Sequence, residues 1–304
     1  MRTDEPEPGD APGLARQPPT DQEPASPRTV TAPPSRAERL AAHESYRETV
    51  AAGDRDAARL AWSQALPGLR AAWHEHQERY PEHSRAVPRT EPDGSWASGR
   101  HRKLNPEQNT EAGKAHADFT DEASQHILPA LRRVEAADPE RKLAGLEHMV
   151  KGEDRLKEKL ADELTGKQKT IGEAIHEIPD AVRFTLSYDT EHYCEGVLAD
   201  VQRLKVEGFV LIKLKNLWAD EQYKGINSQW RIPDTGTRFE MQFHTSESLA
   251  AKELTHEAYA QIRSIEATPA ERRDARAFQR HVNELLSTPP ETDRIKDYPE
   301  KNDA

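Results

Sequence analysis

Two carboxylates in the second half of the chain have a setting that suits metal-assisted phosphate chemistry. Glu240 lies in the run Phe239-Glu-Met-Gln242-Phe-His244, and Asp180 comes just before another run of alternating apolar and polar residues. Side chains alternate along a strand, so Glu240, Gln242 and His244 share a face opposite an apolar one. If the two strands are neighbours, the carboxylates converge and can hold Mg²⁺, which takes one or two carboxylates together with substrate phosphates. A strand-end Asp and an exposed Glu explain the pattern equally well.

A row of cations precedes these strands. Lys151, Arg155 and Lys159 recur at every fourth position and so lie on one side of a helix, or of the loop that opens it. Such a row can hold a polyphosphate through charge and donor geometry. The acidic residues between the cations also fit an ordinary salt-bridged helix surface, which is the more common interpretation.

A third candidate segment is Tyr223-Lys224-Gly225-Ile-Asn227. Its tyrosine can stack on a nucleotide base while neighbouring amide groups contact that base; a loop tyrosine that covers the core is the alternative. The chain has no Walker-type glycine-rich loop, no HExxH motif and no GxSxG motif. P-loop enzymes, zinc proteases and α/β-hydrolases therefore lack support.

The composition excludes further classes of protein. Of the 304 residues, 35% are hydrophobic and 32% charged, against roughly 45–50% and about 25% in typical globular chains, so part of the chain is expected not to pack. The net charge of −11 argues against a general nucleic-acid coat. The single cysteine, Cys194, excludes an intrachain disulfide and indicates a reducing compartment. Neither an apolar run of about 18 residues nor a secretory signal is present, so we expect a cytoplasmic protein that does not enter a membrane.

Shifts in composition divide the chain into segments. The expected segments are a disordered Pro-rich tail (1–34), a helical hairpin (35–80), a linker (81–103), one domain (104–287, core 140–265) and a frayed tail (288–304). Trp96 is unusual for a linker, and we expect it to dock onto the domain that follows.

The spacing of apolar residues predicts the elements that position the candidate residues. A helix capped at Thr120 precedes a second helix, which carries Leu143 and runs through Lys151 and the cationic row. Strands are predicted at 182–188, 209–214, 226–232 and 239–244, with a helix at 193–204 and two closing helices. The strand at 209–214 is apolar enough to be central. The predicted fold class is α+β, a mixed sheet of four to five strands with flanking helices, preceded by a helical region.

Taken in order, these segments resemble the synthetase domain of RelA/SpoT-like proteins. The matching residues are Lys151, Arg155 and Lys159, then Asp180 and Arg183, then Tyr223-Lys-Gly-Ile-Asn227, then Glu240-Met-Gln242-Phe-His244-Thr245, then His256-Glu-Ala-Tyr259. The resemblance covers about residues 140–265. It implies a nucleotidyltransferase-like fold and an alarmone-type (ppGpp) synthetase, which transfers the β,γ-pyrophosphate of ATP to the 3′-hydroxyl of a guanine or adenine nucleotide.

The resemblance also implies roles for individual residues. Asp180 and Glu240 would hold Mg²⁺, and Glu240 would help to deprotonate the attacking hydroxyl. The ATP phosphates would be bound by Lys151, Arg155, Lys159 and Arg183. The acceptor would be bound by Tyr223, which stacks on its base, and by Lys224, Asn227, Gln242 and His244. Positioning and charge neutralisation would provide most of the catalysis, as in other phosphoryl transfers.

Three departures from the family pattern affect these roles. Two residues separate Asp180 from Arg183 where the family has four, although both spacings place the two side chains on opposite faces of a strand. His244 stands where an Arg is usual, and Arg155 where a Ser is common. The chain also lacks an adjacent His-Asp pair, so the hydrolase domain that often accompanies this synthetase is expected to be missing.

Two other functions remain open. A toxin-type enzyme would pyrophosphorylate the 3′ end of tRNA; it would need a basic surface around the site and would be expected to have an antitoxin or immunity partner. Alternatively, the domain is catalytically inactive and binds only a nucleotide or a protein partner.

Overall fold

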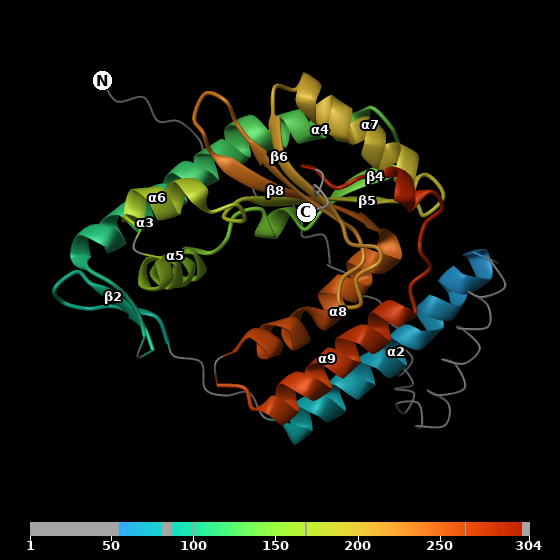
Figure 1. Ribbon diagram of the computed structural model, residues 1–304, viewed down its shortest axis with the longest axis horizontal. Coiled ribbons are helices and arrows are strands. Elements are labelled where there is room, and N and C mark those ends of the chain that lie inside the picture. Colours follow the sequence, from blue (N-terminus) through green and yellow to red (C-terminus); the bar gives the residue numbers. More distant parts are fainter. Residues whose placement is uncertain (1–54, 81–86, 100, 168, 265, 300–304) are drawn as a thin grey trace, which may run out of the picture. The chain divides into compact units, whose positions relative to one another are not determined.

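The computed structural model of this chain describes residues 55–80, 87–99, 101–167, 169–264 and 266–299 (Figure 1). The expected Pro-rich tail and the first helix of the expected hairpin lie outside these residues. Within the described part, none of the helices combines the length and the apolar character needed to cross a membrane.

Eight α-helices and eight strands make up the described part of the chain. The helices are α2 (Arg55–Arg79), α3 (Pro106–Glu122), α4 (Leu128–Ala136), α5 (Glu153–Lys167), α6 (Ile171–Glu177), α7 (Tyr193–Val206), α8 (Ser246–Arg263) and α9 (Pro269–Glu284). The strands are β1 (Arg89–Thr90), β2 (Trp96–Ser98), β3 (Arg102–Leu104), β4 (Arg141–Ala144), β5 (Arg183–Tyr188), β6 (Val210–Asn216), β7 (Ile226–Arg231) and β8 (Arg238–Thr245).

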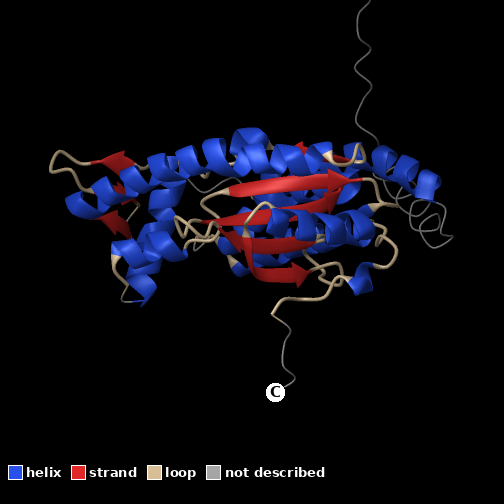
Figure 2. Cartoon of the chain, turned by 90° about the horizontal axis from the view of Figure 1, so that it is seen from above, coloured by secondary structure: helices blue, strands red, loops and turns tan. Residues whose placement is uncertain are grey.

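Five of the strands form a mixed sheet in the order β4-β5-β8-β7-β6. β5 and β8 run parallel, and the other neighbouring pairs are antiparallel. Figure 2 shows these strands side by side. The predicted α+β class with a mixed sheet and flanking helices is confirmed.

The two faces of this sheet differ in chemistry, because side chains alternate along each strand. One face carries Phe184, Leu186, Trp230, Met241 and Phe243, which are almost completely buried. Helices α3, α4 and α7 pack against this apolar face, while α8 lies on the other side of the sheet (Figure 1). Helix α5 packs against α3 and α6 beside the sheet.

Strand β6 forms an edge of the sheet, although its apolar sequence predicted a central position. A segment near the C-terminus covers this edge instead: Leu214 and Tyr298 exchange both of their backbone hydrogen bonds, at 2.8 and 2.9 Å. Asn216 Nδ2 donates to two carbonyls of the same segment, and Ile295 is buried in the core. The prediction of a frayed tail is therefore wrong for residues 288–299, which pack against the sheet.

The helix predicted to carry Leu143 and to run into Lys151 is a strand and a turn instead. Strand β4 pairs antiparallel with β5, and Gly145 then turns the chain with φ +64°, a left-handed conformation that favours glycine. Helix α5 begins only at Glu153, so Lys151 lies in the segment before it. Leu143 and its apolar neighbours pack against the main core from this strand and turn. These apolar residues are spaced as in an amphipathic helix, because all of them pack against the same core.

The helix predicted to start at Thr120 begins earlier. Asn105 caps α3: its side chain accepts a hydrogen bond from Gln108 N (2.8 Å), and the Gln108 side chain accepts one from Asn105 N (3.0 Å). The hydroxyl of Thr120 donates to the carbonyl of His116 inside the helix (2.8 Å). A π-helical turn, Ala123–Ile127, then joins α3 to α4.

Strands β1, β2 and β3 form a small antiparallel sheet where a linker was expected. Trp96 is 1% exposed, and its Nε1 donates to Asp154 Oδ1 on α5 (3.0 Å). The expected docking of Trp96 onto the following elements is thus present. The burial of this large apolar side chain orders the segment.

Helix α2, the second helix of the expected hairpin, packs against α8 and α9. Trp73 Nε1 donates to Glu257 Oε2 on α8 at 2.7 Å, and Tyr80 donates to Asp274 Oδ2 on α9 at 2.7 Å. α8 therefore has one side on the sheet and another side on α2 and α9.

Candidate active site

The face of the sheet opposite the apolar one carries polar side chains in register; we call it the polar face. Its cross-strand rows are Arg183–Glu240–Gln229 and Thr185–Gln242–Asn227, on β5, β8 and β7. The predicted alternation along β8 is correct, since Phe239, Met241 and Phe243 are completely buried in the core. Glu240 and Gln242 are also largely buried, at 6% and 4% exposure, because α8 lies over them.

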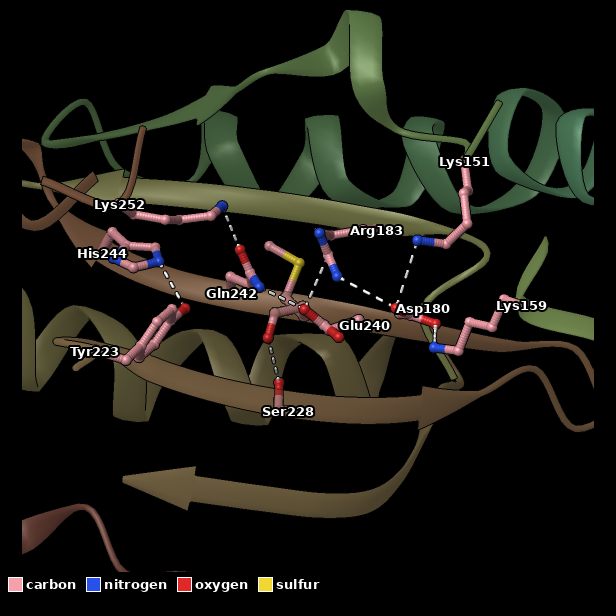
Figure 3. Close-up of polar contacts among 11 residues, drawn as sticks. Lys151, Lys159, Asp180, Arg183, Tyr223, Ser228, Glu240, Gln242, His244 and Lys252 are labelled. Carbon is pink, nitrogen blue, oxygen red and sulfur yellow. Dashed lines mark hydrogen bonds and ion pairs between the residues drawn. The ribbon is translucent and has the colours of Figure 1, made fainter. Parts of the chain in front are cut away.

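Asp180 lies at the entrance to β5, surrounded by three cations (Figure 3). Its carboxylate lies 3.5 Å from Lys151 Nζ, is contacted directly by Lys159 Nζ, and lies 3.5 Å from Arg183 Nη2. Burial by itself would raise the pKa of Asp180, but Lys151, then Lys159 and Arg183, outweigh burial and lower that pKa below its ordinary value. Asp180 is therefore ionised throughout the neutral range.

Arg183 joins the two carboxylates. Its Nε lies 2.9 Å from Glu240 Oε1, while its Nη2 reaches Asp180. The expectation that Asp180 and Arg183 point to opposite faces is wrong. Asp180 precedes the strand in a turn, where the alternation of side chains does not apply, so both side chains reach the polar face.

Asp180 and Glu240 fit a Mg²⁺ site in the kind of donor that they supply. Both carboxylates contact the Arg183 guanidinium, Asp180 through Nη2 and Glu240 through Nε, so they face the same cation. Among the described residues, no group of three or more His, Cys, Asp or Glu side chains is placed to hold a metal. Two carboxylates completed by substrate phosphates and water are the arrangement that Mg²⁺ prefers.

A chain of contacts continues from Glu240 to α8. Gln242 Nε2 donates to Glu240 Oε1, and Lys252 Nζ on α8 donates to Gln242 Oε1 at 2.5 Å. Burial, and then the charge of Arg183, lower the pKa of Lys252 to about 8. The sequence interpretation missed Lys252. The sequence feature that could have identified Lys252 is its position one helical turn after Ser248. Ser248 is the buried residue that bonds to the Thr245 N-cap of α8.

His244 lies behind Tyr223 and is completely buried. Its Nε2 lies 2.8 Å from the Tyr223 hydroxyl, and its Nδ1 lies 2.9 Å from Ser248 Oγ. Burial, with a smaller contribution from Lys252, lowers the pKa of His244 well below its usual value, so the ring is neutral. A neutral imidazole has one donor and one acceptor nitrogen, and both are used here within the protein.

The rest of the predicted acceptor segment lies around this pair. Tyr223 is half-buried at the left of Figure 3, and burial, reinforced by the charge of Glu240, raises the pKa of its hydroxyl well above the usual value. Lys224 Nζ donates to the carbonyl of Trp218 (2.8 Å) and so points into its own loop. Asn227 Oδ1 is buried and has no hydrogen-bond partner among the described residues. That oxygen can accept a hydrogen bond, and its residue lies opposite Gln242 on the neighbouring strand.

Gly225 allows the segment to lie against His244. A Cβ at this position would come within 2.9 Å of both His244 Cε1 and the Phe243 carbonyl oxygen, and its φ is +149°. Only glycine combines this backbone conformation with so close an approach.

Arg155 is not brought to Asp180. It is exposed and pairs with Glu158 (2.8 Å). Of the predicted cationic row, only Lys151 and Lys159 therefore contact the Asp180 carboxylate.

Helix α5 is held in place by a row of acidic residues on another side. Asp154 accepts from Trp96, Glu158 Oε1 accepts from Ser98 Oγ (2.8 Å), and Asp162 accepts two bonds from Arg102 (2.8 and 3.0 Å). These residues recur every fourth position, so one side of the helix faces the small sheet while Lys159 faces the polar face. These contacts join the small sheet to α5, the helix that carries Lys159.

The polar face can thus bind an anion beside two carboxylates. Lys151 and Lys159 approach from one end, Lys252 from the other, and Arg183 lies between them (Figure 3). Negative charge that develops between these groups would be stabilised by their positive charges. This chemistry suits the transfer of a phosphoryl or pyrophosphoryl group.

The chain was also compared with known proteins. No protein-family model and no curated protein matches its sequence. Among solved structures it is similar to the type VI effector Tas1, solved in complex with its immunity protein (17% identity, 57% of this chain and 96% of that one, TM-score 0.37). It is also similar to a GTP pyrophosphokinase family protein from Streptococcus pneumoniae (11% identity, 60% and 91%, TM-score 0.43). A third is small alarmone synthetase 1 from Bacillus subtilis, bound to its product pppGpp (10% identity, 60% and 92%, TM-score 0.40).

Proposed function

We propose that this protein is an ATP-dependent pyrophosphokinase, which transfers the β,γ-pyrophosphate of ATP to the 3′-hydroxyl of a nucleotide. The observation that carries the proposal is the arrangement of Asp180 and Glu240 around Arg183, with Lys151 and Lys159 at the same site. Two carboxylates beside fixed cations are suited to hold a metal–polyphosphate and to neutralise its charge.

In this mechanism the acceptor 3′-oxygen attacks the β-phosphorus of ATP. The new bond joins that oxygen to the β-phosphorus, the bridge between the α- and β-phosphates breaks, and AMP leaves. Glu240 is the carboxylate on β8 that accepts the hydroxyl proton, and Arg183 holds it in position from β5. Mg²⁺ held by Asp180 and Glu240 would neutralise phosphate charge when bound.

Lys151 and Lys159 bind the phosphates in this mechanism. Burial first, opposed by Asp180, lowers the pKa of Lys151, so its ammonium gains from any further anion placed beside it. Arg155 contributes only if it leaves Glu158. The exposed position of Arg155 permits that movement.

The acceptor is bound on the other part of the polar face. The half-buried ring of Tyr223 stacks on the base, and the unpartnered Asn227 Oδ1 accepts a hydrogen bond from it. His244 acts through Tyr223, because both of its ring nitrogens are already used. The acceptor is a guanine or adenine nucleotide, or the 3′-terminal adenosine of tRNA.

The test is incubation of the purified chain with ATP labelled in its γ-phosphate, Mg²⁺ and each acceptor in turn. We expect label on one acceptor and a loss of at least about 100-fold in Glu240→Gln, the scale reported for removal of a single transition-state contact. Glu111→Gln, an exposed carboxylate on α3, is the matched control and should match the wild type. Equal transfer by Glu240→Gln refutes the site. Absence of label on every acceptor would contradict the proposal and favour the alternative, a catalytically inactive module that binds a nucleotide or a protein partner.

A further inference from the structure

Lys252 is a half-buried cation with an incomplete set of partners. Its Nζ donates to the neutral Gln242 Oε1, and the described residues place no carboxylate within ion-pairing distance of it. Figure 3 shows its side chain extended along the polar face toward Gln242. A desolvated ammonium held by one amide oxygen is unfavourable on its own, and it is therefore suited to receive an anion.

Charged groups of both signs surround Lys252. Arg183 on β5 repels it, whereas Glu240 on β8 and Glu253 on its own helix attract it. The positive charge of Lys252 in turn lowers the pKa of two imidazoles, those of His244 on β8 and His256 on α8, and so favours their neutral forms. Helices α2 and α9 contact α8 through other residues, Ala251 and Ala258 among them. Glu240 is already paired with Arg183, so the only hydrogen bond of the Lys252 ammonium among the described residues is the one to Gln242.

We propose that Lys252 is a phosphate-binding residue, which contacts the polyphosphate of the bound nucleotide from α8, opposite Lys151 and Lys159. This inference rests on the proposed function in taking a nucleotide polyphosphate as the ligand. With Lys252 included, the phosphate site has cations on two sides, and a bound polyphosphate would extend from α5 to α8 past Arg183. It also makes Gln242 an adjustable partner that holds the ammonium until the anion binds.

A low pKa in the free protein supports this role. At pH 8 about half of the Lys252 side chains are neutral, given a pKa of about 8. An anion bound beside the ammonium stabilises the charged form and raises that pKa, so binding takes up a proton. Anion binding through this residue should weaken as the pH rises above 8, because less of the free protein carries the charge.

The first test measures the affinity for ATP and for AMP by isothermal titration calorimetry at pH 8. In Lys252→Met, we expect the ATP affinity to fall about 10- to 100-fold while the AMP affinity changes less than about 2-fold. Lys252→Arg should recover most of the ATP affinity. Lys252→Gln keeps a hydrogen-bond donor for Gln242 without the charge, and it should bind ATP as weakly as the Met variant. Lys205→Met, an exposed lysine on α7, is the control.

The second test repeats the wild-type titration in buffers that differ in ionisation enthalpy. ATP binding should take up protons in the wild type, and this uptake should fall in Lys252→Met. Full recovery by Lys252→Gln would overturn the proposal in favour of a role in positioning Gln242. Equal losses for ATP and AMP, or an unchanged ATP affinity, would overturn it as well.

The two proposals fail in different ways. If the wild type binds ATP through Lys252 but transfers no label, the pyrophosphokinase proposal is wrong and the phosphate site remains. If the wild type transfers label and Lys252→Met does so at the same rate and the same ATP affinity, the phosphate-site proposal is wrong and the activity remains.

Discussion

Arg183 and Glu240 lie side by side on parallel strands, with Arg183 Nε 2.9 Å from Glu240 Oε1. The same guanidinium reaches Asp180. Arg183 thus occupies the position between the two carboxylates where positive charge is most favourable. A metal ion and a phosphate chain would both have to share this position with it.

We predict that Arg183→Met lowers pyrophosphate transfer at least about 10-fold, the effect of losing a charged transition-state contact of about 1.4 kcal/mol. The same variant should bind Mn²⁺ more tightly when no nucleotide is present, because a competing cation has been removed. Electron paramagnetic resonance of bound Mn²⁺ measures this affinity. A weaker Mn²⁺ affinity would show that Arg183 supports the metal rather than competing with it.

Removing Arg183 should also raise the pKa of Asp180, since Arg183 is one of three cations that lower it. A carboxyl ¹³C titration compares the wild type with Arg183→Met. Because the pKa of folded Asp180 lies below the unfolded value, its stabilising contribution is present above about pH 4 and is lost as the pH falls through the folded pKa. The substitution raises only the folded pKa, so the loss should be smaller in the variant and should be complete at a higher pH.

His244 makes a prediction about stability and pH. Its folded pKa is far below the unfolded value of about 6.5, so below that pH the unfolded chain binds a proton that the folded protein does not. Stability should therefore fall as the pH drops from 7 to 5, by up to about 1.4 kcal/mol per pH unit from this residue. Urea unfolding at several pH values measures this slope.

The matched variant for that slope is His244→Gln, which keeps polar contacts but does not titrate. Its slope should be smaller than that of the wild type in the same interval. His256→Gln is the control: His256 is exposed at the surface of α8, and its pKa is lowered less. An unchanged slope in His244→Gln would mean that the imidazole is charged in the folded protein.

Gly225→Ala should destabilise the protein more than Gly145→Ala does. Both glycines have positive φ, but a Cβ meets nothing within 4 Å at Gly145, whereas at Gly225 it meets His244 and the Phe243 carbonyl at 2.9 Å. The backbone strain should cost about 1 kcal/mol at either position. The excess at Gly225 then measures the close approach. Thermal unfolding of both variants decides this, and equal losses would contradict it.

Trp96→Phe tests whether the small sheet orients α5. The change removes the hydrogen bond to Asp154 (3.0 Å) and keeps most of the buried ring, so we expect a loss of about 1 kcal/mol of stability. The ATP affinity should fall several-fold, because α5 carries Lys159. Trp230→Phe is the control: it also removes a buried indole donor, to Ser228 at 2.8 Å, but on the apolar face. A similar fall in ATP affinity for both variants would indicate a general loss of packing.

The sequence predicted β8 well, because alternation specifies a strand with two chemically different faces. It also predicted β5, β7 and helix α7, whose apolar residues all point into one core. The position of β6 was predicted wrongly, since residues near the C-terminus bury its edge and an apolar strand does not reveal which neighbour covers it. The small sheet was missed because its strands have only two or three residues and depend on the burial of Trp96.

The candidate site was predictable where residues lie on one strand and less so where it depends on contacts between elements. Glu240 and Gln242 follow from a single run of sequence. The bridging position of Arg183 depends on β5 and β8 being neighbours, and on Asp180 lying in a turn. Lys252 reaches the site because Ser248 fixes the rotation of α8 against His244, which no short motif specifies.

The segment that pairs with β6 has a consequence for the behaviour of the protein at high concentration. An uncovered edge strand offers free backbone N–H and C=O groups to another chain, and proteins protect such edges from intermolecular pairing. Here Leu214 and Asn216 are already bonded to residues 292–298. Loss of that segment, by proteolysis or truncation, would expose the unpaired backbone groups of β6 to other chains. The shortened protein should therefore aggregate at concentrations at which the intact protein stays dispersed.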